Sequence, residues 1–176
     1  MISAEEQRAN QMIVAGDLAG ARPILVQLCQ DNPDNATFHY RAACVHDGLG
    51  LEKEALPFYQ EAFKLGGLSD EDLEGAYVGL GSTYRVLGYF GKSAEVLLEG
   101  SKKFPNSQCM KIFEAMTLHE SGRHNLAVAM LLHCIADKPG DASVALYRRA
   151  IQQYASEYGK IDEECAGLKS AVNTNF

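Results

Sequence analysis

The stretch LGSTYRVLGYFGKSAEVLLEGSKKFP, residues 80–105, shows most clearly how this chain folds. In it, Gly88 is followed after five residues by the small residue Ser93 and after seventeen by Pro105, which cannot continue a helix. The same pattern recurs along the chain, with glycines 34, 38 and 34 residues apart. The three series are Gly16, Gly50, Gly88 and Gly122; Ala21, Ala55, Ser93 and Ala127; and Pro33, Gly67, Pro105 and Pro139. A period near 34 residues predicts an all-α solenoid of stacked helix-turn-helix repeats.

Four such repeats and a terminal cap use nearly all of the 176 residues, so we expect one domain. The repeats are expected at about residues 2–35, 36–69, 74–107 and 108–141, and the capping helices at 142–172. The third repeat is preceded by four extra residues. Ser69, with Asp72 three residues later, predicts a capped helix start there and a lengthened first helix.

The C-terminal cap is expected to bury one apolar side of a helix that carries Tyr147, Ile151, Tyr154 and Tyr158. A solenoid needs a terminal element with one polar face, because its last apolar surface would otherwise stay open. Gly159 is expected to allow a turn into a shorter amphipathic helix.

Two prolines break the helical pattern. Pro23 and Pro57 lie 34 residues apart, each two residues after a packing alanine. A proline inside a helix removes a hydrogen bond and clashes with the preceding turn. We therefore expect the second helices of the first two repeats to kink or to begin late at these points.

The third repeat resembles the tetratricopeptide repeat, whose signature has Leu-Gly, Tyr, Gly, an aromatic residue, a small residue and Pro at matching spacings. The matching residues are Leu80, Gly81, Tyr84, Gly88, Phe90, Ser93, Leu97, Gly100 and Pro105. The resemblance implies a right-handed α-solenoid and is greatest to small, acidic bacterial members of the family to which no function is assigned. Glu114 departs from it, because the family places an apolar residue there.

The resemblance also implies a concave surface, lined by the first helices of the repeats, that binds another protein or a peptide. Carried over to this sequence, the ligand-facing positions are Asn10, Ile13, Tyr40, Cys44, Asp47, Val78, Ser82, Arg85, Ile112, Met116 and His119. They combine an apolar centre with a polar rim, as protein interfaces do. Ile13 and Cys44 fit packing against neighbouring helices equally well. Some members grip a C-terminal carboxylate with lysine, asparagine and arginine at these places, where this sequence has residues that include Glu6, Cys44, Val78 and Ser82. We therefore do not expect a carboxylate clamp.

The formal net charge is −7, and the sequence shows no basic stripe of the kind that binds the phosphates of nucleic acid. The N-terminal residues do not have the pattern of a signal peptide, and no apolar stretch is long enough to span a membrane. The five cysteines are scattered and lack a C-x-x-C pair, which is typical of a reducing compartment. We therefore expect a cytoplasmic protein.

We expect neither a metal-binding site nor a catalytic site in this chain. The cluster of zinc-ligand types, Cys109, His119, His124, His133 and Cys134, does not converge in the repeat frame, in which Cys134 points inward and His133 outward. No catalytic or phosphate-binding motif is present. We expect neither a metal, nor a cofactor, nor enzymatic activity.

Three functions fit this sequence. The first is an adaptor that binds a helical or extended apolar peptide segment in its concave groove. The second is a dedicated chaperone for a secreted substrate, similar to the acidic repeat chaperones of type III secretion. The third is a self-assembling structural protein, with a homodimer formed through the C-terminal helices.

Overall fold

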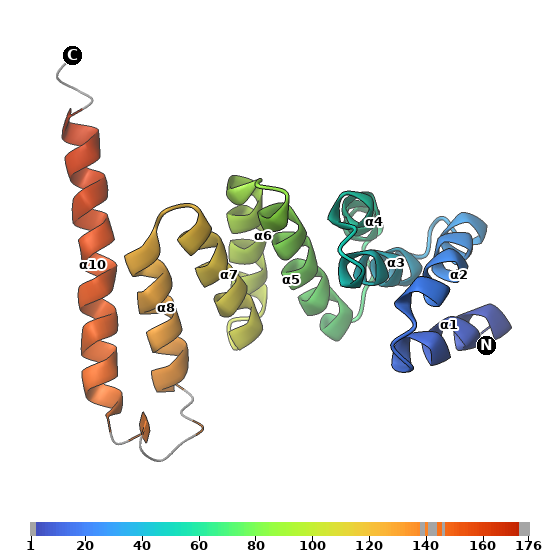
Figure 1. The fold of residues 1–176 in the computed structure, drawn as a ribbon, viewed down its shortest axis with the longest axis horizontal. Coiled ribbons are helices and arrows are strands. Elements are labelled where there is room, and N and C mark those ends of the chain that lie inside the picture. The colour runs from blue at the N-terminus through green and yellow to red at the C-terminus, as the bar shows by residue number, and fades with distance from the viewer. Residues whose placement is uncertain (1–2, 138–139, 141–143, 146, 173–176) are drawn as a thin grey trace. The chain divides into compact units, whose positions relative to one another are not determined.

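The computed structural model describes residues 3–137, 140, 144–145 and 147–172, with side chains up to residue 160. In these residues the chain forms helices and no strand, and the all-α prediction is confirmed (Figure 1). The helices are α1 (Ala4–Val14), α2 (Leu18–Asp31), α3 (Ala36–Gly48), α4 (Glu52–Leu65), α5 (Asp70–Val86), α6 (Phe90–Lys103), α7 (Gln108–Glu120), α8 (His124–Asp137) and α10 (Arg148–Val172). No helix in the described part of the chain has the length and apolar character needed to cross a membrane. Pro139, which was predicted to end a helix, lies outside the described residues.

The glycines of the repeat pattern each end a helix in a left-handed backbone conformation. Their φ angles are 80° at Gly16, 71° at Gly50, 78° at Gly88 and 85° at Gly122. A residue with a side chain is strained in this conformation, so glycine closes each pair of helices into a tight turn. The periodicity of the sequence is therefore a periodicity of backbone geometry.

Short polar side chains begin several of the helices. Ser69 Oγ accepts a hydrogen bond from the backbone N–H of Asp72 at 3.1 Å, as the sequence predicts. Asp17, Asn35 and Ser107 cap α2, α3 and α7 in the same way. α5 has 17 residues, whereas α3 and α7 have 13 each, so the lengthened first helix of the third repeat is also confirmed.

The two interior prolines do not mark the beginnings of their helices. Pro23 and Pro57 each occupy the sixth position, in α2 and in α4, and both helices begin five residues earlier. The expected late start is therefore wrong, and the alternative, a kink at each proline, stays a prediction. The first turns are held by other bonds, since the N–H of Ala21 donates to the carbonyl of Asp17 at 3.1 Å and that of Ala55 to Leu51 at 2.9 Å. Both prolines are exposed, so the carbonyl that each leaves unpaired can bond to water.

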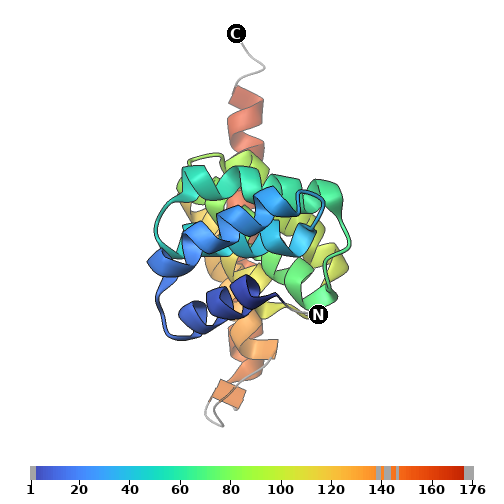
Figure 2. The same ribbon diagram turned by 90° about the vertical axis from the view of Figure 1, so that its right-hand side faces the viewer.

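The chain divides into two compact units, residues 1–96 and 97–176, with the boundary inside α6. In the first unit each helix from α1 to α5 packs against the next along the chain (Figure 2). Its core has one cluster around Leu25, Phe38 and Val45 and a second around Tyr59 and Leu80. A single domain over residues 1–176 stays a prediction.

In the second unit α8 packs against both α7 and α10. α10 runs without a break from Arg148 to Val172, so the expected turn at Gly159 is wrong. The expected buried face is also wrong in part, because Tyr154 and Tyr158 are exposed and Ala155 is buried. A Cβ at Gly159 would lie 3.9 Å from the side chains of Ala129 and Leu126, so α10 turns its small residues toward α8.

Two interior helix glycines are expected to respond in opposite ways to alanine. A Cβ at Gly79 would come within 2.2 Å of the Tyr59 hydroxyl and 2.5 Å of its ring, and Tyr59 is buried. Gly79→Ala should lower the free energy of unfolding by about 1–3 kcal/mol through overpacking. At Gly159 the added Cβ meets only ordinary van der Waals contacts, so Gly159→Ala should stabilise by about 0.5–1 kcal/mol.

Urea unfolding followed by circular dichroism measures both changes against the unsubstituted chain. A Gly79→Ala variant whose free energy of unfolding is unchanged would contradict the packing described for Tyr59. A destabilising Gly159→Ala would indicate that the chain turns at this residue, as a break in α10 requires.

Candidate functional site

In the first unit, the predicted ligand-facing residues of α3 are engaged between helices. Tyr40 packs against the cluster around Tyr59. Its hydroxyl lies so close to Gly75 of α5 that a Cβ added at Gly75 would be 2.2 Å from the hydroxyl oxygen. Tyr59 meets Gly79 of α5 in the same way. Two tyrosines from α3 and α4 are thus accommodated by two glycines one turn apart on α5. Tyr40 therefore contributes to the packing between helices of this unit and is not a freely accessible surface residue.

Asp47 and Cys44 belong to the same polar network. Thr83 Oγ1 lies 2.9 Å from both carboxylate oxygens of Asp47, and the Tyr59 hydroxyl donates to Cys44 Sγ at 3.8 Å. Burial raises the pKa of the Asp47 carboxyl, and hydrogen bonds from Tyr59 and Thr83 oppose that shift. Burial likewise raises the pKa of the Cys44 thiol, which disfavours the reactive thiolate. Cys44 therefore fits the packing interpretation.

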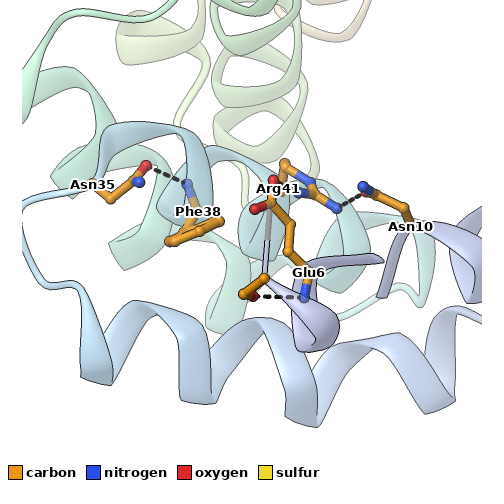
Figure 3. A network of polar contacts seen from close by, with 6 residues as sticks. Glu6, Asn10, Asn35, Phe38 and Arg41 are labelled. Carbon is orange, nitrogen blue, oxygen red and sulfur yellow. Dashed lines mark hydrogen bonds and ion pairs between the residues drawn. The ribbon is translucent and has the colours of Figure 1, made fainter. Parts of the chain in front are cut away.

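The N-terminal positions are also tied to a neighbouring helix (Figure 3). Arg41 of α3 donates a hydrogen bond to Asn10 Oδ1 and forms an ion pair of 3.4 Å with Glu6, both on α1. Ile13 packs against the core cluster around Leu25. Asn10 and Ile13 therefore connect α1 to its neighbours, although neither is fully buried.

The remaining predicted residues of the first unit are Val78, Ser82 and Arg85, which are half-buried along α5. They recur at spacings of four and three residues and so lie along one side of the helix. All eight predicted positions of this unit are partly covered. Contacts with neighbouring helices or with the core are described above for Asn10, Ile13, Tyr40, Cys44 and Asp47.

The second unit differs, because its predicted residues are open. Ile112 is 40% and Met116 39% exposed, and His119 is also exposed. With Cys109, which is exposed as well, these residues recur at spacings of three and four and form a single stripe on α7. We call Cys109, Ile112, Met116 and His119 the α7 stripe. Two large apolar side chains one turn apart are thus exposed on one first helix.

Within the predicted cluster of zinc-ligand types, His119 and His124 lie next to each other. Their rings are 4.6 Å apart and their Nδ1 atoms 3.1 Å apart, across the turn between α7 and α8. Cys134 is buried and His133 exposed, as the sequence predicts. Among the described residues there is no group of three or more histidine, cysteine, aspartate or glutamate side chains that could hold a metal ion.

Comparison with known proteins identifies the family. The model of the Tetratrico peptide repeat family matches residues 35–158. This chain is a tetratricopeptide repeat protein. Among solved structures it resembles the crystal structure of MamA, with a TM-score of 0.67 and 18% sequence identity over 97% of this chain and 99% of that one. This likeness concerns the fold alone. No curated protein sequence matches.

One feature of this repeat protein was not predicted from its sequence, a pocket of about 470 Å³ in the second unit. Its lining residues are Ser101, Lys111, Glu114, Leu126, Ala129, Met130, His133, Ala155, Ser156, Gly159 and Lys160. Glu114, where the family has an apolar residue, was the only signal in the sequence. Its carboxylate accepts a hydrogen bond from Ser101 Oγ at 3.3 Å, and burial raises its pKa. The departure from the family pattern thus marks a half-buried carboxyl beside a pocket.

Replacing Glu114 by glutamine is expected to stabilise the protein at neutral pH. Because the folded-state pKa is raised, folding disfavours the charged carboxylate, and this cost is present above the ordinary glutamate pKa. The advantage of Glu114→Gln over the unsubstituted chain should therefore shrink as the pH falls through the raised pKa and disappear below the ordinary one. Thermal unfolding across an acid-to-neutral pH series measures it.

The control is Glu95→Gln, which removes the same charge from an exposed position of α6 and reports the effect of net charge alone. An advantage of Glu114→Gln that is no larger than that of the control, or that persists in acid, would contradict the burial of the carboxylate.

Proposed function

We propose that this protein is a peptide-binding interaction module and that the α7 stripe is its anchoring surface. Members of the tetratricopeptide repeat family act as protein-protein interaction modules, which supports the general class. The observation that carries the finer proposal is the exposure of Ile112 and Met116 on the same side of α7. Binding energy in protein interfaces concentrates in a few large side chains near the centre.

The contrast between the two units supports this surface over the predicted positions of the first unit. There, Tyr40, Cys44 and Asp47 already hold α3, α4 and α5 together, so a ligand would gain little from them without disturbing the core. The α7 stripe offers apolar area that no described contact covers.

The chemistry of the stripe indicates the kind of partner. Apolar side chains at spacings of three and four on α7 complement an amphipathic helix or an extended apolar segment. The net charge of −7 favours a segment with basic residues beside its apolar ones, because complementary charge speeds association. We propose that the protein acts as an adaptor for such segments in the cytoplasm, where its buried free thiols, such as Cys29, stay reduced.

The test selects peptides from a display library of short random sequences on the immobilised full chain. A selected peptide is then titrated by fluorescence anisotropy. Ile112→Glu/Met116→Glu should weaken binding roughly 30-fold or more, the loss of about 2 kcal/mol typical of an interface hot spot. Its matched control is Val128→Glu/Ile135→Glu, which makes the same charge change at two exposed apolar positions of α8.

Circular dichroism establishes that both variants stay folded. If the library yields no binding peptide, or if both variants weaken binding equally, the α7 stripe is not the binding surface. A single insoluble partner that this protein alone keeps in solution would favour the dedicated chaperone over the adaptor.

A further inference from the structure

The pocket of the second unit lies at places that are apolar and packed one repeat earlier. Three pairs of residues are equivalent when the repeats are aligned on their turn glycines: Phe63 and Ser101, Tyr77 and Lys111, and Leu80 and Glu114. The ring centroids of Phe63 and Tyr77 lie 4.9 Å apart, and Leu80 packs in the cluster around Tyr59. The three counterparts of these residues are polar, and all of them line the pocket. The pocket is therefore a place where polar residues replace apolar core residues.

The rest of the pocket wall is mostly apolar. It comes from α8 and α10, which pack side by side (Figure 1). Its apolar members are Leu126, Ala129, Met130, Ala155 and Gly159. The other three lining residues, His133, Ser156 and Lys160, are exposed. A pocket of about 470 Å³ with a largely apolar wall and a few polar groups is typical of a binding site for a small organic molecule.

Glu114 brings a negative charge to this wall without a cation to balance it. Among the described residues, no lysine, arginine or histidine forms an ion pair with Glu114, and its carboxylate accepts a hydrogen bond from Ser101 Oγ at 3.3 Å. Burial raises the pKa of this carboxyl, and the bond from Ser101 opposes the rise. The positive charge of Lys111 instead opposes the rise in the pKa of the Cys134 thiol on α8. A half-buried carboxylate without a cationic partner costs stability, and a bound cation would offset that cost.

We propose that the pocket binds a small organic amine, with its ammonium group at Glu114 and Ser101 and its apolar body against α8 and α10. An ammonium group has three N–H donors, which the Glu114 carboxylate and the Ser101 hydroxyl can accept. Hydrogen bonds between two charged groups are about twice as strong as those between neutral groups. The pocket shares no residue with the α7 stripe, so small-molecule binding goes beyond the proposed function and does not depend on it.

An anionic ligand is the alternative, because two lysines and a histidine also line the pocket. Lys160 and His133 are exposed, so water screens their charges. Lys111 is half-buried, as Glu114 is. A ligand carboxylate would therefore meet Lys111, but it would also be repelled by Glu114, whereas an amine gains the charge that Glu114 lacks.

Nitrogen–proton correlation NMR of the full chain tests the proposal with pentylamine, hexylamine and phenethylamine as probes. Each amine is compared with the alcohol and the carboxylate that have the same apolar body. The amines should bind roughly ten times more tightly than either comparison compound, because only they make a hydrogen bond between opposite charges. The largest shifts are expected at pocket residues such as Ser101 and Ala129.

Variants of the charged residues locate the ammonium group. Glu114→Gln keeps the size of the side chain and removes its charge, so it should weaken amine binding roughly tenfold and leave alcohol binding unchanged. Because this variant is expected to gain stability, weaker binding would not result from unfolding. The matched control, Glu95→Gln, removes the same charge at an exposed position of α6 and should bind the amines as the unsubstituted chain does. Lys111→Gln should tighten amine binding, since it removes a like charge from the pocket wall.

Four results would each overturn the proposal. They are a carboxylate that binds more tightly than its amine, a Glu114→Gln variant that binds the amines as well as Glu95→Gln does, weaker amine binding by Lys111→Gln, and three amines that leave the pocket residues unshifted. Acetyl-lysine amide with a free side-chain amine carries the same ammonium group on a more polar body and should bind more weakly than hexylamine. If it binds more tightly than all three amines, the pocket takes a lysine side chain of a protein, and the assignment to a small amine is wrong.

Discussion

The fold of this protein depends on the close approach of two helices at a small side chain five residues after each turn glycine. Ala21, Ala55 and Ser93 are fully buried, and Ala127 nearly so. At Ser93 the hydroxyl also donates to the carbonyl of Gly81 at 2.7 Å, so even the one polar member of this series is satisfied inside the packing. A larger side chain at any of these positions would force the helices apart, because cores are packed too densely to absorb added volume.

This constraint has different consequences in the two units. In the first, glycines on α5 let Tyr40 and Tyr59 reach across from α3 and α4, and the residues expected to meet a ligand are used to hold helices together. In the second, Ile112 and Met116 remain exposed on α7. The same repeat pattern thus produces a consolidated surface in one part of the chain and an open apolar one in another. A partner is therefore expected to bind where apolar side chains are exposed and are not already packed between helices.

The sequence predicted the candidate site only as a set of positions. Spacing places a residue on a side of a helix, but it does not say whether a neighbouring helix reaches it. Tyr40 and Ile112 occupy comparable places in their repeats, and only the long-range contact with Gly75 distinguishes the first from the second. Glu114 shows the same limit. Its type departs from the family, yet its half-buried carboxyl and the adjoining pocket arise from helices distant in sequence.

The sequence by itself determined the repeats, the turns and most helix starts, because these follow from local chemistry: a left-handed glycine, a capping hydroxyl or carboxylate, a small residue at a fixed offset. Only the tertiary structure decided that α10 is a single helix and which side of it faces α8. Glycine weakens a helix by about 1 kcal/mol, and packing along α8 can outweigh so small a local preference. That packing buries Ala155 beside Gly159 and leaves the tyrosines exposed, because which side of a helix is covered depends on its neighbours and not on its own periodicity.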